Sequence, residues 1–115
     1  MPNDATKSNR RFDRISTPKG LWVAWQHNGN QSVSRVRDLN AGGLFIATPT
    51  SVPVGAVIQV LLSVPEGEIR SQAIVRNVTP GAGVGIEFKD MSPQDADRLG
   101  RLITRLLRAG PGEAA

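Results

Sequence analysis

Between Leu21 and Phe88 the sequence changes repeatedly from a short apolar run to turn-forming glycine, proline or asparagine. Runs of this length are typical of β-strands, which usually extend over about five or six residues. The Asn28-Gly29 dipeptide separates the first two runs, and it is the strongest short-range sequence signal for a two-residue hairpin turn. The six apolar runs are 21–26, 32–37, 43–47, 56–64, 69–78 and 84–88. The pattern predicts six short strands joined by turns, which form a closed or nearly closed antiparallel β-barrel.

After residue 90 the apolar spacing changes to that of a helix. Ser92 is a favourable N-cap, and Pro93 follows at the first helical position, where its missing N–H group has no intrahelical partner to lose. Apolar residues then recur at helical spacing, at Leu99, Leu102, Ile103, Leu106 and Leu107. We predict an amphipathic helix that ends near Ala109-Gly110 and covers an open end or flank of the barrel. The opposite face carries four basic residues that we interpret as a solvated helix surface, Arg98, Arg101, Arg105 and Arg108.

A chain of 115 residues fits one domain with a single core, which we expect to be all-β with one helix. Residues 1–9 are polar and lack periodicity, so we expect a flexible tail, followed by the folded domain at 10–109 and a C-terminal tail at 110–115. The N-terminus lacks the apolar core of a signal peptide, and the most hydrophobic run, 56–64, is too short to cross a bilayer. We therefore expect a cytoplasmic protein without a membrane span.

Positive charge is concentrated in the first third of the sequence. The net charge is +4, but residues 1–37 contain seven Lys and Arg residues against two Asp residues. A field of this sign attracts nucleotides, nucleic acids and acidic membrane surfaces. Arg10 and Arg14, with Arg11 between them, suit phosphate and guanine, because a guanidinium group stays charged and presents paired N–H donors. By composition alone, a solvated basic tail is the simpler interpretation.

Residue content disfavours several kinds of active site. The sequence has no cysteine, which excludes disulfides and thiolate metal ligands. The single histidine, His27, lies beside the Asn28-Gly29 turn and away from acidic or nucleophilic clusters, so we predict no catalytic or metal site. The glycine-rich run 81–85 leads into a strand, whereas a phosphate-binding loop leads into a helix, and we interpret it as a hairpin turn. These features favour a binding protein over an enzyme.

The segment from Asp38 to Gly43 has the composition of a turn that can approach the edge of a ligand. A carboxylate only accepts hydrogen bonds, so Asp38 can pair with the N1–H and the exocyclic amine of guanine. Asn40 both donates and accepts, and Gly42 or Gly43 allows a positive φ or a backbone position close under a ring. Taken alone, the same residues are equally typical of a plain β-turn between the second and third strands.

The two polar segments together resemble a known family. Arg10-x-x-x-Arg14 before the first strand and Asp38-x-Asn40-x-x-Gly43 after the second are similar to the Arg-x-x-x-Arg and Asp/Asn-x-Ser-x-x-Gly motifs of the PilZ domain family of cyclic di-GMP receptors. The resemblance covers about residues 9–108 and includes the six-strand pattern and the closing helix. It also includes the strand segments Ala73-x-Val75-x-Asn77 and Gly85-Ile86-Glu87-Phe88. Asn40 departs from the serine that the family usually has.

The resemblance implies a non-catalytic receptor whose ligand is cyclic di-GMP, with no other cofactor. Arg10 and Arg14 would bind phosphates and guanine faces, and Arg11 would assist. Asp38, Asn40 and the Gly42-Gly43 pair would hold a guanine edge. Members of the family commonly act on motility, exopolysaccharide production or biofilms, so the resemblance implies a single-domain adaptor with a protein partner that the sequence does not identify.

Two other functions remain open. A small basic barrel that binds RNA or DNA would use the same arginines, but it would also need exposed aromatic residues for stacking, and aromatic residues make up only 4% of the chain. We therefore disfavour nucleic acid as the partner. The other alternative is a PilZ-like interaction module that no longer binds nucleotide, against which the retained arginine pair argues.

Overall fold

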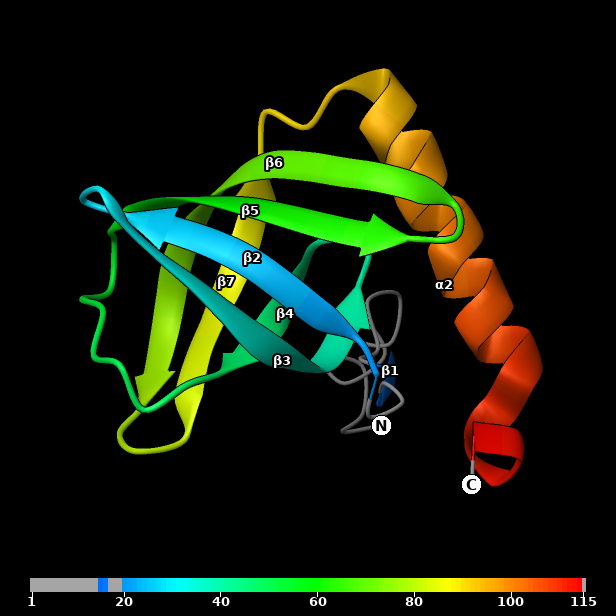
Figure 1. The fold of residues 1–115 in the computed structure, drawn as a ribbon, viewed down its shortest axis with the longest axis horizontal. Helices are drawn as coiled ribbons and strands as arrows, with labels where there is room; N and C mark the ends of the chain where they lie inside the picture. The colour runs from blue at the N-terminus through cyan, green and yellow to red at the C-terminus, as the bar shows by residue number, and fades with distance from the viewer. Residues whose placement is uncertain (1–14, 17–19, 115) are drawn as a thin grey trace, which may run out of the picture.

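The computed structural model describes residues 15–16 and 20–114, with side chains described from residue 20 to residue 108. This part of the chain forms seven strands and one helix (Figure 1). In chain order they are β1 (Ile15–Ser16), β2 (Trp22–His27), β3 (Asn30–Asn40), β4 (Gly43–Ala47), β5 (Val57–Val64), β6 (Gly67–Thr79), β7 (Gly83–Lys89) and α2 (Pro93–Ala114). Each apolar run of the sequence corresponds to one of the strands β2 to β7. No helix within the described residues is long and apolar enough to cross a membrane.

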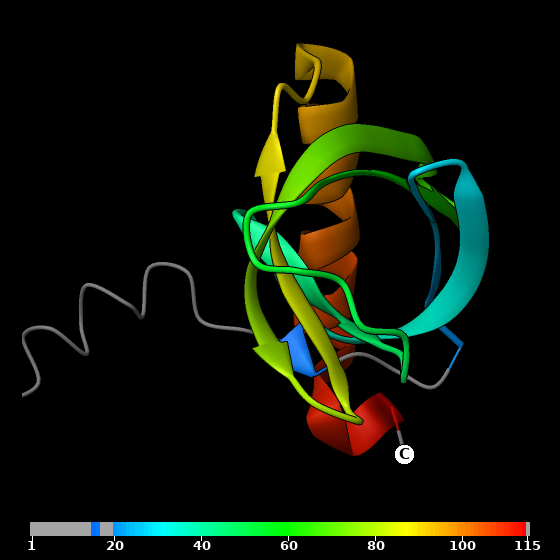
Figure 2. The same ribbon diagram turned by 90° about the vertical axis from the view of Figure 1, so that its left-hand side faces the viewer.

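Strands β2 to β7 form a closed antiparallel barrel, which appears as a ring in Figure 2. Around the ring the strand order is β3-β2-β5-β6-β7-β4, and pairing of β4 with β3 closes it. The predicted six-stranded barrel with a C-terminal helix is therefore confirmed. The two-residue β1 pairs with β3 as an additional strand, and it was not predicted, because two residues carry no periodicity.

The β2–β3 hairpin has the predicted two-residue turn. Asn28 and Gly29 have φ angles of 51° and 80°, and His27 pairs with Asn30 across the turn. A type I′ turn requires a positive φ at both central residues, which asparagine and glycine adopt most easily. The glycine-rich run 81–85 likewise begins in the β6–β7 turn and continues into β7, as predicted.

The strand β3 is longer than predicted and contains a β-bulge. It reaches Asn40, so the prediction that Asp38 and Asn40 lie in a turn is wrong, and the turn itself consists of Ala41-Gly42. The pairing of β3 with β4 shifts register between Val36 and Asp38, which leaves Arg37 as the extra residue. A bulge interrupts the alternation of polar and apolar residues, and this is why the sequence pattern stops before the strand does.

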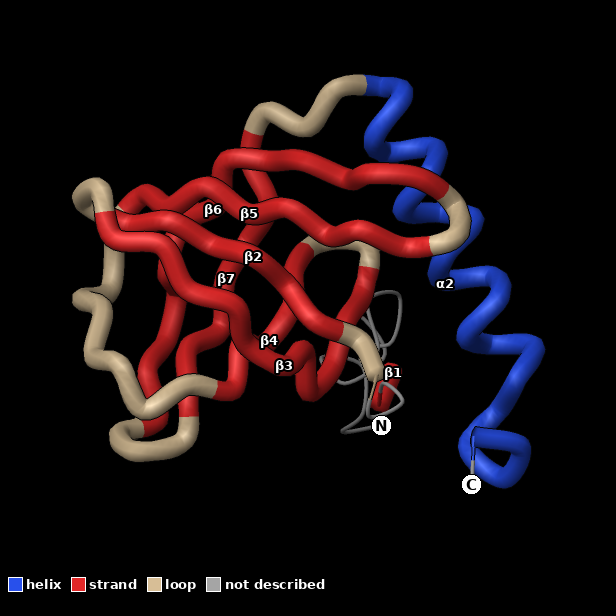
Figure 3. The backbone as a smooth tube through the Cα atoms, in the orientation of Figure 1, coloured by secondary structure: helices blue, strands red, loops and turns tan. Residues whose placement is uncertain are grey.

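Different elements close the two ends of the barrel. The helix α2 lies across one end (Figures 1 and 2), where Leu99, Leu102 and Leu106 join the buried core. The loop 48–56, the longest connection between the strands β2 to β7 (Figure 3), lies at the other end and inserts Val52, which is 1% exposed. Core side chains occupy the interior, so a ligand site has to be sought on the outer surface.

The helix α2 begins at the predicted N-cap and is held to the barrel by two arginines. The backbone N–H of Asp95 donates to Ser92 Oγ at 3.0 Å. Arg105 Nε donates to Glu66 Oε2 at 2.6 Å, and Arg98 Nη1 donates to a backbone carbonyl of β6 at 2.9 Å. The interpretation of the arginine stripe as a solvated face is incomplete for these two residues, because each also donates a hydrogen bond to the barrel.

The helix also continues to Ala114, past the end predicted near Ala109-Gly110. Glycine and proline disfavour helix without forbidding a last turn.

The contact between Glu66 and Arg105 predicts a pH-dependent stability. The hydrogen bond from the Arg105 guanidinium lowers the pKa of Glu66 below its ordinary value of 4.5. A carboxylate whose pKa is depressed by folding contributes stability above its unfolded pKa, and that stability is lost as the pH falls through the folded pKa. Because the Arg105 side chain is 46% exposed, we expect Glu66→Gln to reduce the free energy of unfolding at neutral pH by at most about 1 kcal/mol.

Urea denaturation at neutral pH and again well below pH 4.5 measures this effect, which should disappear at the lower pH. The matched control is Glu68→Gln, because the Glu68 side chain pairs with Arg70 on its own strand, with both groups more than half exposed. An equal loss for both variants at both pH values would contradict the assignment to Glu66.

Candidate functional site

Near the end of β3, two adjacent charged side chains lie on the outer surface of the barrel. In a regular strand, Arg37 and Asp38 would point to opposite faces. The bulge turns both away from the core, while Val36 and Leu39 on either side are buried with 0% exposure. The Asp38 carboxylate lies 3.5 Å from Arg37 Nε and its side chain is 16% exposed. The bulge therefore holds a carboxylate at a defined place on the outer face.

Arg37 packs on an aromatic ring of the neighbouring strand. Its Cζ atom lies 3.8 Å from the centroid of the Phe45 ring, the geometry of a cation–π contact. Gly83 of β7 leaves space for this ring, because a Cβ atom there would lie 2.6 Å from Phe45 Cε2. The Arg37 side chain remains 52% exposed. Sequence reasoning did not assign Arg37 to the site, and its position directly before Asp38 was the only available signal.

The β3–β4 turn is organised by Asn40. Its Oδ1 accepts hydrogen bonds from the backbone N–H groups of Gly42 at 2.8 Å and Gly43 at 2.9 Å. Neither glycine has a positive φ. Gly43 instead allows close approach to β7, since a Cβ atom there would lie 1.9 Å from the carbonyl oxygen of Ile86. The structure brings Asp38, Asn40, Gly42 and Gly43 to one end of the hairpin, and it shows structural roles for Asn40 and Gly43.

Replacing Asn40 tests this role. We expect Asn40→Ala to lower the free energy of unfolding by about 1–2 kcal/mol, because two backbone N–H groups lose their acceptor. Asn40→Asp keeps an oxygen in the same place and is the matched control, with an expected change of less than about half of that. Urea denaturation of the three proteins checks this, and equal stability of Asn40→Ala and the unsubstituted chain would contradict it.

A shallow depression of about 350 Å³ adjoins the turn. It is lined by residues of the hairpin, β6 and β7, namely Asn40, Gly42, Gly43, Arg76, Asn77, Gly85, Ile86 and Glu87. A second bulge, between Val75 and Asn77, turns both Arg76 and Asn77 outward. Arg76 forms an ion pair with Glu87, and Gly85 leaves room for Asn77, whose Oδ1 would lie 2.6 Å from a Cβ atom there. Sequence reasoning did not assign these residues to the site, although two consecutive polar residues in an alternating strand, as at Arg76 and Asn77, mark such a bulge.

The two-residue strand β1 lies beside the same end of β3. Ile15 pairs with Leu39, and Ser16 pairs with Asp38. Antiparallel partners have Cα atoms about 4.5–5.5 Å apart, so residue 15, which directly follows the arginine motif, is next to the second motif. Arg10, Arg11 and Arg14 themselves lie outside the described residues.

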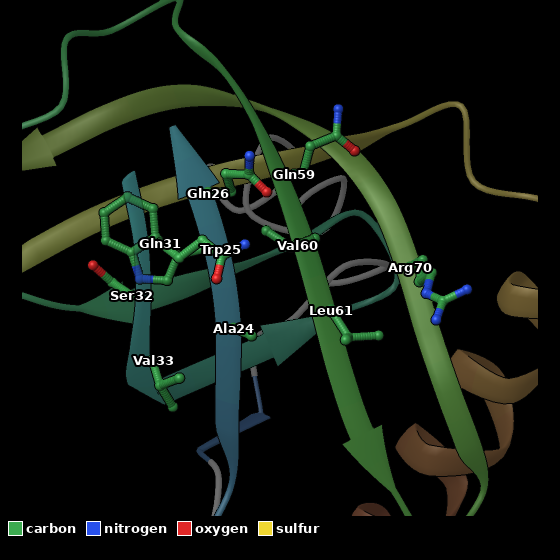
Figure 4. A pocket seen from close by; sticks show the side chains of 10 residues that line it. All are labelled: Ala24, Trp25, Gln26, Gln31, Ser32, Val33, Gln59, Val60, Leu61 and Arg70. Carbon is green, nitrogen blue, oxygen red and sulfur yellow. The ribbon is translucent and has the colours of Figure 1, made fainter. Parts of the chain in front are cut away.

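A larger depression, of about 640 Å³, lies on the outer face of β2, β3 and β5 (Figure 4). It contains none of the residues that the sequence assigns to the nucleotide site. Within the described ranges 15–16 and 20–114, no group of three or more His, Asp or Glu residues is arranged to hold a metal ion.

Known proteins share this architecture. The crystal structure of YcgR from Escherichia coli in complex with c-di-GMP has a TM-score of 0.74 at 21% sequence identity, covering 91% of this chain and 49% of that chain. The PilZ domain of YcgR with c-di-GMP has a TM-score of 0.68 at 22% sequence identity, and the match covers 91% of this chain and 96% of that chain. The Bacillus subtilis inhibitor of motility MotI/DgrA has a TM-score of 0.71 at 20% sequence identity, and the match covers 86% of this chain and 52% of that chain.

The chain spans about half the length of the full YcgR and MotI/DgrA chains. At sequence identities of 20–22%, the similarity to these solved structures shows a shared fold. No curated protein gives a significant sequence match. The family model described as "PilZ domain" matches residues 8–105, which is most of the chain. From this match and from the closed barrel, the chain belongs to the PilZ domain family of cyclic di-GMP receptors.

Proposed function

We propose that the chain binds cyclic di-GMP on the outer face of the barrel, between the N-terminal arginine motif and the end of the β3–β4 hairpin, and signals through a protein partner without catalysis. The observation that carries the proposal is the pairing of β1 with β3. It puts Ile15 opposite Leu39 and Ser16 opposite Asp38, so the backbone of the residue two positions after Arg14 pairs with the aspartate of the second motif.

The chemistry of the hairpin suits a guanine base. Asp38 lies beside Arg37 on the outer face, and the two oxygens of a carboxylate match the N1–H and amino donors of guanine. Adenine offers an acceptor at N1 in place of the donor, so the same carboxylate discriminates against it. The Oδ1 atom of Asn40 is used by the turn, and therefore this side chain would meet a guanine acceptor with its amide nitrogen.

The phosphates would be bound by arginines. Guanidinium groups form paired, charge-assisted hydrogen bonds with phosphate oxygens, which assigns this role to Arg10 and Arg14, with Arg11 assisting. Arg37 adds a further cation directly beside Asp38, held on the ring of Phe45. The solved complexes of YcgR with c-di-GMP, which share the fold, support the same ligand class.

As an adaptor, the chain would transmit binding through a change at its surface. A ligand that bridges the arginine motif and the hairpin draws the segment before β1 against the barrel, which alters the surface that a partner meets. The family resemblance points to motility, exopolysaccharide or biofilm control as the process.

Isothermal titration of the full chain tests the proposal, with cyclic di-GMP, cyclic di-AMP and a short single-stranded oligonucleotide as probes. We expect saturable heat with cyclic di-GMP and little with the adenine analogue. No heat with cyclic di-GMP, or equal heat with both dinucleotides, would overturn the proposal. Oligonucleotide binding that falls steeply with salt and ignores the base would instead identify a nucleic-acid-binding barrel.

A further inference from the structure

An apolar groove of about 310 Å³ lies between the β3–β4 turn, the end of β7 and the helix α2. Within the part of the chain that the structure describes, no charged side chain lines it, and its walls are formed by Ala41, Phe88, Met91, Ala96, Leu99, Gly100 and Ile103. Phe88, Met91 and Ile103 pack against the core but are only partly buried. The described residues therefore leave apolar surface uncovered beside the hairpin that carries Asp38.

The register of β1 indicates which segment can reach this groove. The antiparallel pairing of β1 with β3 matches Ile15 with Leu39, and β1 also contacts α2, which forms one wall of the groove (Figure 1). The same register, continued backwards along the chain, would match Phe12 with Gly42. The carbonyl of Gly42 accepts a hydrogen bond at 2.9 Å from the backbone N–H of Phe88, which lines the groove.

We propose that the side chain of Phe12 binds this groove and holds the arginine motif beside the β3–β4 hairpin. Phe12 lies outside the described residues, and it is the only apolar residue in positions 6–14. Three residues of extended chain span about 10 Å, so Phe12 can reach the groove from Ile15. A cavity of about 150 Å³ is enough for a benzene molecule, so the groove has room for the phenyl ring. Removing that ring from water favours the contact.

Such an anchor would also assist ligand binding, and this part of the inference rests on the proposed function. Arg10, Arg11 and Arg14 are each within two residues of Phe12. Holding Phe12 in the groove restricts the positions of the three guanidinium groups before a ligand arrives. Ordering a binding segment in advance raises affinity, because less conformational entropy is lost on binding. Phe12 would thus act as a positioning residue that contacts the groove and not the nucleotide.

Disulfide trapping tests the anchor without any ligand, because the chain has no cysteine of its own. The continued register matches Asp13 with Ala41, and antiparallel partners have Cα atoms about 4.5–5.5 Å apart, within the range that a disulfide spans. In oxidised glutathione, we expect the chain with Asp13→Cys and Ala41→Cys to form this bond at least about ten times faster than the same chain with Phe12→Ser. Phe12→Leu keeps an apolar side chain and should restore most of the rate.

Two lysine substitutions on α2 provide a matched pair for the groove itself. Ala96→Lys places a long charged side chain in the groove and should slow trapping as much as Phe12→Ser does. Thr104→Lys adds the same charge at an exposed position of α2 that does not line the groove, and it should leave the rate unchanged. The proposal is wrong if no disulfide forms, if Phe12→Ser does not slow trapping, or if both lysines slow it equally.

Isothermal titration with cyclic di-GMP is the second readout. Phe12→Ser should weaken binding about tenfold and Phe12→Leu by less than about threefold, because the leucine still occupies the groove. Equal affinity of Phe12→Ser and the unsubstituted chain would exclude the positioning role. If the unsubstituted chain binds no cyclic di-GMP, the proposed function fails, whereas the trapping rates still decide whether Phe12 occupies the groove.

Discussion

Replacing Gly43 with alanine is expected to cost about 3 kcal/mol or more of the free energy of unfolding, a large share of the stability of a small domain. The added Cβ atom would lie 1.9 Å from the carbonyl oxygen of Ile86 and 3.0 Å from its carbonyl carbon. Both are backbone atoms of β7, so no side-chain rotation relieves the contact. The β4–β7 pair must separate there, and β4 is needed to close the barrel. Urea denaturation or thermal unfolding measures the loss.

The matched control is Gly42→Ala in the same turn. Its Cβ atom would meet only Asn40 Oδ1, at the ordinary contact distance of 3.5 Å, so we expect a change within about 1 kcal/mol. Similar stability of the two variants would show that β4 and β7 adjust easily. Comparing the stability of these two variants also matters for binding experiments. If Gly43→Ala lost ligand binding, the cause would be a disturbed barrel and not the loss of a contact between Gly43 and the ligand.

Replacing Asp38 with alanine is expected to weaken cyclic di-GMP binding by about 100-fold. Two hydrogen bonds from a guanine edge to a carboxylate together contribute about 3 kcal/mol, and each 1.4 kcal/mol corresponds to a factor of ten. The Asp38 side chain lies on the outer face, so the core is not disturbed. Titration calorimetry measures the affinity, and the thermal midpoint shows that the variant is folded.

Glu68→Ala is the control for Asp38→Ala, because it removes a carboxylate that is more than half exposed and does not line the depression beside the turn. Its affinity for cyclic di-GMP should equal that of the unsubstituted chain. Arg14→Ala should weaken binding as strongly as Asp38→Ala and should also reduce its salt dependence, because it removes a phosphate partner. If Asp38→Ala binds as tightly as the unsubstituted chain, the hairpin does not read the base, although the fold assignment stands.

Local patterns predicted most of the secondary structure. The Asn28-Gly29 turn, the strands β4, β5 and β7 and the Ser92 cap each depend on preferences expressed within a few adjacent residues. Closure of the barrel followed from the number and spacing of the strands. The end of β3 was predicted wrongly, because the bulge at Arg37 breaks the alternation from which a strand is recognised.

The candidate site was predicted only in part. The sequence placed Asp38, Asn40, Gly42 and Gly43 in one short segment, and the structure keeps them together. It did not indicate that Asn40 and Gly43 serve the turn and the β4–β7 contact. It also did not assign Arg37 or the Arg76-Asn77 pair to the site, because their approach to the hairpin depends on how strands distant in sequence pair.

The sequence by itself determined the six strands of the barrel, the C-terminal helix and the two polar motifs, because turn propensity, strand alternation and helix capping act between near neighbours. Only the tertiary structure decided which residues next to one motif lie beside the other motif in space. The pairing of β1 with β3 places Ile15 and Ser16 beside Leu39 and Asp38, the bulge directs the Asp38 carboxylate outward, and the approach of β7 explains Gly43. Each depends on the register with which distant strands meet, and closing the barrel is what sets that register.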